Sequence, residues 1–246
     1  MPKFFVDQSQ ITCEEIEIVG EDVNHIKNVM RMHLGEEITI NDRQGHDYEC
    51  IISNISVDRI KCSIKQVNAS QNEPLVHTCL FQSLVKGEKM DFIIQKSVEI
   101  GVSHIIPIST ERCVVKVDDR KRLESKIGRW NKISESAAKQ SGRGMVPTVS
   151  MPLCFDKAIK YASENLGKSC IPYEKENNIK LKSFLKSSSC SSIGIFIGPE
   201  GGFTEQEIKL AVSYNIEPVT LGRRILRSET AGMVVLSNIM YEAGEM

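Results

Sequence analysis

Two glycine-containing segments near the C-terminal end carry the residue types best suited to holding a ligand. The first is Gly198-Pro199-Glu200-Gly201-Gly202, and the second runs from Leu221 to Ala231. Glycine has no Cβ atom, so its backbone amide can approach a ligand closely and can adopt positive φ. A tight turn uses the same residues, so the glycines alone leave a ligand site and a simple turn both open.

The second segment adds charge and apolar surface, because Arg224 and Arg227 flank Ile225 and Leu226. This composition could seat the apolar edge of a ring and still meet an anion. The alternative is a surface turn whose arginines pair with Glu229. The chain lacks the phosphate-binding pattern G-x-x-x-x-G-K-[ST] and the dinucleotide pattern G-x-G-x-x-G, so neither a nucleoside triphosphate nor a dinucleotide is favoured.

Both segments are predicted to lie where strands end and helices begin. Ile193–Ile197 is a short apolar run that predicts a buried strand, and Thr204–Glu207 has the pattern of a capping box that opens a helix. Val219–Leu221 predicts a second strand end, and Glu229–Glu242 predicts the last helix. Ligands of open α/β sheets bind beyond the carboxyl ends of strands, so one shared ligand site is predicted.

The elements that would position these segments fall into two predicted domains. Residues 1–70 are expected to form a small β-barrel, with one amphipathic helix over Asp22–Met32. The polar stretch 68–74 is the predicted linker. Residues 74–246 alternate strands with helices, which indicates an α/β domain with a largely parallel sheet. The expected strands of the first domain are Glu37–Asn41, Tyr48–Ile55 and Ile60–Val67.

Bulk properties exclude several classes of protein. The net charge of −1 provides no global attraction for nucleic acid, although a local basic face from Arg120 to Arg143 carries eight Lys or Arg against two Glu. That face is either an RNA contact or a solvated helix surface. We expect no transmembrane helix, no signal peptide and no metal site, and we expect reduced cysteines in a cytoplasmic protein.

At the two glycine segments the chain resembles one family. G-P-E-G-G-F followed by L-G-x-R-I-L-R-x-E-T-A resembles the RsmE family of ribosomal RNA uridine-N3 methyltransferases, in the SPOUT superfamily. The resemblance continues through almost the whole chain, although Asp42-Arg43-Gln44-Gly45 departs from an expected D-G-x-G. Its further motifs lie at Lys86–Met90, Gln95–Val102, Thr110–Arg112, Arg129–Trp130, Ala137–Arg143 and His25–Met32.

The resemblance implies an S-adenosyl-L-methionine-dependent enzyme that methylates N3 of a uridine, U1498 of 16S rRNA in the small ribosomal subunit. It also implies an N-terminal PUA-like β-barrel that binds RNA, a C-terminal SPOUT domain with a deep trefoil knot, and a homodimer. Two alternatives stay open. One is a SPOUT enzyme for another RNA, for example one that methylates a tRNA ribose at the 2′-oxygen, and the other is a non-catalytic RNA-binding protein.

The matching positions supply candidate site residues. Arg227 is expected to stabilise the uracil anion, and Glu200 or Glu229 is either the base or the partner that orients an arginine. Trp130 could stack on a base, but a place in the core is favoured. The expected RNA contacts are Lys27, Arg31, Lys86, Arg112 and Arg143. The expected cofactor contacts are Gly198, Pro199, Glu200, Gly201, Gly202, Leu221, Gly222, Ile225, Leu226, Arg227, Thr230 and Ala231.

Overall fold

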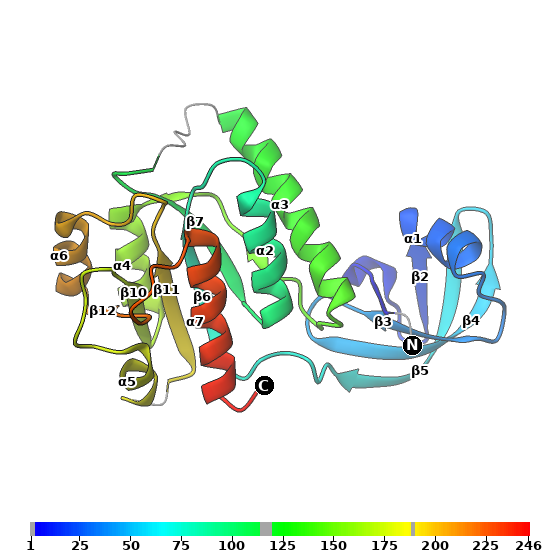
Figure 1. The fold of residues 1–246 in the computed structure, drawn as a ribbon. Helices are drawn as coiled ribbons and strands as arrows, with labels where there is room; N and C mark the ends of the chain where they lie inside the picture. Colours follow the sequence, from blue (N-terminus) through cyan, green and yellow to red (C-terminus); the bar gives the residue numbers. More distant parts are fainter. Residues whose placement is uncertain (1–2, 114–119, 188–189) are drawn as a thin grey trace. The chain divides into compact units, whose positions relative to one another are not determined.

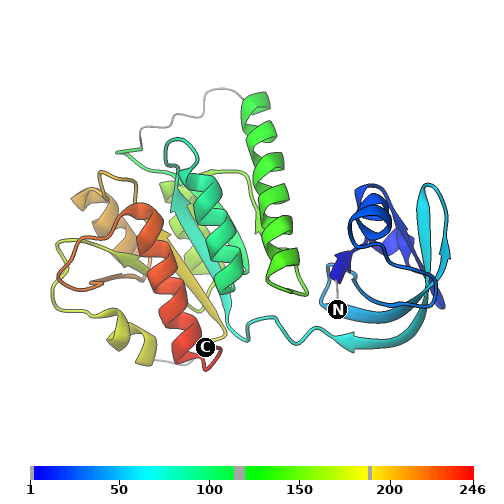
Figure 2. The same cartoon turned by 45° about the vertical axis from the view of Figure 1, so that its right-hand side comes forward.

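The computed structural model describes residues 3–113, 120–187 and 190–246, which form two compact units (Figures 1 and 2). Unit 1 contains Met1–Glu73 together with Ala138–Val146. Unit 2 contains Pro74–Ala137 and Pro147–Met246. Residues 138–146 fall in the second predicted domain, but in the structure they belong to the first unit. The chain therefore passes between the units three times.

The described part of unit 1 is a five-stranded sheet that packs around its own apolar core. The strands alternate between exposed and buried side chains, and the core includes Ile16, Ile38, Ile40 and Ile60. β1 and β2 each pair with a single neighbour among the described residues, so the hydrogen-bonded path is open. Its order is β1 (Lys3–Phe5), β3 (Glu37–Asn41), β4 (His46–Ile55), β5 (Arg59–Ala69) and β2 (Glu15–Val19).

The prediction of one regular helix over Asp22–Met32 is wrong. The structure has a short α1 (Glu21–Asn24) followed by a π-helical turn, η2 (His25–Val29). In that turn the amide of Met30 bonds to the carbonyl of His25, which widens the turn. Val29 and Met30 consequently leave the apolar face and are 65% and 38% exposed.

A buried ion pair explains why residues 138–146 belong to unit 1. Arg143 is 4% exposed, and its guanidinium Nη2 lies 2.7 Å from Oε2 of Glu73. Oε1 of Glu73 also accepts the backbone amides of Gly144 and Met145 at 2.8 and 3.0 Å. Asn72 donates to the carbonyl of Gly142 at 2.9 Å. The end of the predicted linker and the segment after the long helix α3 (Arg120–Gln140) are therefore joined side by side.

Unit 2 is built on a parallel sheet, as expected from its alternating strands and helices. In its described residues the sheet has seven strands, and all of its pairings are parallel. The order is β12 (Ile216–Val219), β10 (Lys168–Pro172), β11 (Ser192–Ile197), β6 (His77–Ser83), β7 (His104–Ser109) and β8 (Thr148–Val149), with β9 (Leu153–Cys154) also on β7.

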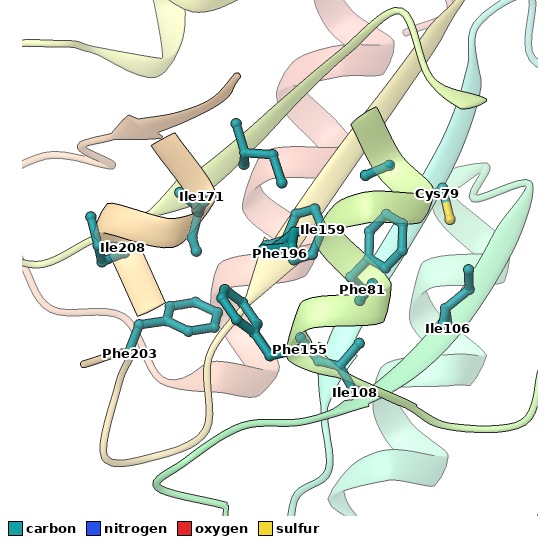
Figure 3. Close-up of a cluster of buried hydrophobic side chains, with 14 residues drawn as sticks. Cys79, Phe81, Ile106, Ile108, Phe155, Ile159, Ile171, Phe196, Phe203 and Ile208 are labelled. Carbon is teal, nitrogen blue, oxygen red and sulfur yellow. The ribbon is translucent and has the colours of Figure 1, made fainter. Parts of the chain in front are cut away.

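Helices cover both faces of this sheet, because residues buried on both sides of a strand need two apolar layers. On one face α4 (Phe155–Asn165) and α6 (Glu205–Ser213) pack against Phe81 and Phe196, whose rings stack with centroids 4.2 Å apart (Figure 3). On the other face α2 (Lys89–Ile100) and α7 (Ser228–Glu242) pack together, and α5 (Leu181–Lys186) lies against α7. The capping box predicted at Thr204 is confirmed.

Trp130 belongs to the core rather than to a base-stacking surface. It is 4% exposed on α3, and its Nε1 donates to Oδ1 of Asp91 on α2 at 3.0 Å. Ser134 and Asn131, on the same helix, bond to the backbone of Pro147 and Val149. The favoured interpretation of Trp130 is therefore confirmed.

The Arg143–Glu73 pair yields a stability prediction. Truncating one partner of a buried pair leaves the other charge unpaired, so Arg143→Ala should lower the free energy of unfolding by about 3–5 kcal/mol. Urea unfolding followed by circular dichroism would measure it. The exposed pair Lys65–Glu37 is the matched control, and Lys65→Ala should have a far smaller effect, because surface ion pairs contribute little to stability. Equal losses in the two variants would contradict a structural role for Arg143.

Candidate functional site

A pocket of about 590 Å³ opens at the carboxyl ends of β10, β11 and β12 in unit 2. Both glycine segments line it, as the predicted strand ends required. Of the residues expected to contact a cofactor, Thr230 is the one that does not line the wall in the described structure. The wall contains Lys89, Pro172, Tyr173, Glu174, Asn177, residues 197–203, residues 220–228 and Ala231.

The first segment is a tight turn and a pocket wall at once. The amide of Gly202 bonds to the carbonyl of Pro199 at 2.9 Å, and Gly202 has φ +67°. A Cβ on Gly198 would lie 3.1 Å from the ring of Phe203, and one on Gly201 would lie 3.3 Å from the side chain of Arg112. These glycines therefore let the loop turn and let its neighbours pack closely, which leaves the outer edge of the turn facing the pocket.

The second segment leads into α7 through Arg227. The carbonyl of Arg227 accepts the amides of Thr230 and Ala231, both at 2.9 Å, so the helix starts directly at the pocket. Ile225 is 88% exposed at the pocket rim. In the part of the chain that the structure describes, the guanidinium of Arg227 is exposed and has no hydrogen bond or ion pair. An exposed, unpaired cation at a pocket wall is available to an anionic ligand.

Lys89 forms ion pairs with one carboxylate from each glycine segment. It is not among the site residues expected from the sequence. Its Nζ lies 3.1 Å from Oε1 of Glu200 and 3.5 Å from Oε2 of Glu229. The alternative of a surface turn whose arginines pair with Glu229 is wrong, since Glu229, like Glu200, lies against the lysine at the start of α2. The Oε2 atom of Glu229 is buried and makes this ionic contact without a well-formed hydrogen bond.

The charges and hydrogen bonds around Glu200 and Lys89 shift the pKa values of both groups. The bond from its own backbone amide and then the contacts with Lys89 hold the pKa of Glu200 below its ordinary value of 4.5. The hydrogen bond to Glu200 raises the pKa of Lys89, with Glu229 adding to the effect. Glu200 and Lys89 are therefore both ionised near neutral pH, and Glu200 is a weak base.

The expected RNA contacts separate into three sets. Arg112 lies beside the pocket, where its Nη1 donates to the carbonyl of Gly201 at 2.8 Å, and Lys86 is exposed close enough to Glu200 to lower its pKa. Lys27 and Arg31 lie in unit 1, where Lys27 donates to the carbonyl of Ser56. Arg143 is buried against Glu73, so the expectation that it contacts RNA is corrected: its charge is already used inside unit 1.

Tyr173, Glu174 and Asn177 line the pocket but were not expected there. They follow β10, which lies between β11 and β12 in the sheet, a neighbourhood that no local pattern predicts. Tyr173 and Glu174 also line a second hollow of about 430 Å³, together with Arg112, Lys175 and Lys209. The usable signal was their position directly after a strand of the parallel sheet.

The described residues contain neither a metal-binding cluster nor a membrane-spanning helix. No group of three or more His, Cys, Asp or Glu side chains is arranged to hold a metal ion in them. No helix in the same residues is both long and apolar enough to cross a membrane.

Known proteins resemble both units. The RNA methyltransferase domain family matches residues 71–240, and an RNA methyltransferase PUA domain matches residues 18–65. The chain is 35% identical to ribosomal RNA small subunit methyltransferase E of Bacillus subtilis (strain 168), over 98% of this chain and 97% of that one. The protein of that name from Mesomycoplasma hyopneumoniae (strain 232) is 32% identical, over 98% of this chain and 100% of the relative.

A solved structure extends the likeness to three dimensions. The ribosomal RNA small subunit methyltransferase E of Neisseria gonorrhoeae, crystallised bound to S-adenosyl methionine, superposes with a TM-score of 0.85. It is 32% identical in sequence and covers 98% of this chain and 97% of its own.

The Lys89 contacts predict the titration of Glu200. In Lys89→Met the pKa of Glu200 should rise toward 4.5 yet stay below it, because the bond from its own amide remains. Carboxyl ¹³C NMR titration would measure the shift. Glu176, whose pKa is lowered chiefly by backbone amides of Asn178 and Ile179, is the internal control and should not move. An unchanged Glu200 would show that Lys89 does not tune it.

Proposed function

Since the chain belongs to the ribosomal RNA small subunit methyltransferase E family, we propose that it transfers a methyl group from S-adenosyl-L-methionine to small-subunit rRNA. The proposed target is N3 of a uridine, U1498 of 16S rRNA. The observation that carries the proposal is the pocket at the ends of β10, β11 and β12, with the unpaired Arg227 in its wall. This function requires a cation beside a small-molecule pocket.

The residues of the pocket suit S-adenosyl-L-methionine. Its volume of about 590 Å³ lies in the range of small-molecule sites, and its wall combines apolar side chains with exposed turn backbone. Pro199, Leu221, Leu226 and Ala231 would contact the apolar faces of the cofactor. The first turn of α7 presents unpaired amides and the positive end of the helix dipole, which would favour a carboxylate.

The bound cofactor would supply an electrophilic methyl group on a positively charged sulfur. The chain's residues must then position the base and stabilise the negative charge that arises when N3 of uridine loses its proton. We propose that Arg227 performs the second task. Its guanidinium is the suitable group because it is exposed, always charged and unpaired in the described structure.

We propose a supporting role for the two carboxylates. Glu200 has a lowered pKa and therefore a weak affinity for a proton. Glu229 lies against Lys89 in the first turn of α7, where its negative charge also interacts favourably with the positive end of the helix dipole. Both carboxylates would hold Lys89 and the two loops in place, and the proton of N3 would leave to solvent or to a group of the RNA.

Recognition of the RNA is proposed to use Arg112 and Lys86 beside the pocket, and Lys27 and Arg31 in unit 1. The hollow beside Tyr173 offers one further cation, Lys209, to phosphates of the target strand, whereas Lys175 is already paired with Glu205 at 2.6 Å. The target base must be unpaired or flipped to reach the pocket. Binding of RNA should weaken as the salt concentration rises, because each phosphate contact releases counterions.

A homodimer and a deep trefoil knot are further proposals from the family. In support of the dimer, Phe92 on α2 and Tyr241 on α7 are 45% and 70% exposed. In support of the knot, the chain leaves β12 at the sheet edge and returns to pack α7 against β11 and β6. Sedimentation equilibrium would test the dimer, and the extension of a single molecule pulled from its ends would test the knot.

Mapping the modified nucleotide decides between this function and its alternatives. Deletion of the gene should remove one N3-methyluridine from the small-subunit rRNA, and the purified protein with S-adenosyl-L-methionine should restore it. Mass spectrometry of rRNA digests measures both. A missing modification in tRNA instead would indicate another RNA substrate, and no S-adenosyl-L-methionine binding in calorimetry would indicate an RNA-binding module without catalysis.

The role of Arg227 predicts a separation of binding from turnover. Arg227→Ala should bind S-adenosyl-L-methionine and RNA much as the wild type does, while kcat falls by about 10²–10³, the loss typical of a removed charge stabiliser. Arg227→Lys should recover part of the rate, since it keeps the charge but not the planar fork. Lys182→Ala, at an exposed position of α5 outside the pocket wall, is the control and should keep the wild-type rate. Full turnover by Arg227→Ala would exclude this role.

A further inference from the structure

Ser228, the first residue of α7, is buried and bonds to the glycine loop. It is 7% exposed, and its hydroxyl donates to the carbonyl of Gly198 at 2.6 Å. The peptide between Gly198 and Pro199 has no N–H, because proline lacks one. Its carbonyl is the only hydrogen-bonding group of that peptide, so Ser228 determines where the first peptide of the loop points.

Gln82 lies behind Ser228 at the end of β6, with no exposed surface. Its Nε2 donates to Oγ of Ser228 at 3.0 Å and to the carbonyl of Ser83 at 3.2 Å. The single hydroxyl hydrogen of Ser228 is already donated to Gly198, so Ser228 can only accept from Gln82. This fixes the orientation of the Gln82 amide and leaves its Oε1 buried without a partner among the described residues.

These contacts connect three elements that are distant in sequence. Gln82 is the second-last residue of β6, Gly198 follows the neighbouring strand β11, and Ser228 begins α7. The Gln82–Ser228 bond is buried and the Ser228–Gly198 bond is partly buried, and such bonds orient the backbone because an unpaired polar group there is costly. The resemblance leaves position 228 unspecified in R-x-E-T-A and includes no motif at position 82.

We propose that Gln82 and Ser228 are positioning residues that hold the Gly198–Gly202 turn in the shape that receives S-adenosyl-L-methionine. We refer to their side chains and the Gly198 carbonyl as the Gln82–Ser228 strut. Neither side chain performs chemistry on the substrate. The inference rests on the proposed function, since it names the residues that shape that same cofactor pocket.

Two single variants and their combination test the strut. Ser228→Ala removes both bonds of the Ser228 hydroxyl, and Gln82→Met removes the bond to Ser228 together with the bond to the carbonyl of Ser83. Each variant should weaken S-adenosyl-L-methionine binding about 3- to 10-fold in calorimetry, because each ends the support of the Gly198 carbonyl from Gln82 through Ser228. The double variant should lose no more than the weaker-binding single variant, because Gln82 acts on the Gly198 carbonyl through the Ser228 hydroxyl. Ser228→Thr keeps the hydroxyl and should bind within about twofold of the wild type.

A second readout does not require the cofactor. Hydrogen exchange of the peptide spanning residues 198–204 should be faster in Ser228→Ala and Gln82→Met than in the wild type. Ser97→Ala, a buried serine of α2 whose hydroxyl lacks a partner in the described residues, should leave this exchange unchanged. Thermal unfolding of each variant separates local loosening from global loss of the fold.

The outcomes distinguish the strut from the proposed function. Wild-type affinity and wild-type exchange in both single variants would overturn the strut, as would a double variant with additive losses. A wild-type protein that fails to bind S-adenosyl-L-methionine would contradict the proposed function instead. In that case faster exchange at residues 198–204 would still support the strut, and unchanged exchange would overturn it.

Discussion

The parallel pairing of β10 with both β11 and β12 is the constraint on which the site depends. Pro172 lies opposite Val219, and Cys170 lies opposite Ile195, so the three strands end at one edge of the sheet. Each strand is followed by a loop that enters the pocket. Because the strands are buried on both faces, a slip of register would disrupt the packing of their side chains against both helix layers, and the alignment of the loops is therefore as firm as the core itself.

Once the loops meet, short-range electrostatics and hydrogen bonds give the pocket its character. Lys89 brings Glu200 and Glu229 together and leaves Arg227 without a carboxylate partner in the described structure. The separation matters chemically, since an arginine already paired with a carboxylate would have less charge to offer a developing anion. Behind this charged layer, Ser228 and Gln82 provide uncharged, buried contacts to the glycine turn.

Much of unit 2 could be predicted from local patterns because those patterns are local in origin. The last helix, predicted over Glu229–Glu242, is observed over Ser228–Glu242, and the capping box at Thr204 follows from side chains three positions apart. The prediction over Asp22–Met32 failed because periodicity assumes 3.6 residues per turn, and the π-helical turn at His25–Val29 breaks that period. No local sequence pattern here distinguishes a regular α-helical turn from a π-helical turn.

By itself the sequence determined the kind of site: two glycine segments at strand ends, rich in arginine, with a family resemblance that names a methyl donor. Tertiary structure alone decided which side chains are free to act there. Arg143 and Arg227 are both arginines within recognisable motifs, yet one is buried against Glu73 and the other is exposed at the pocket. The reason is that the partner of a buried arginine can lie far away in the sequence, as Glu73 lies 70 positions before Arg143. No spacing along the chain encodes that proximity.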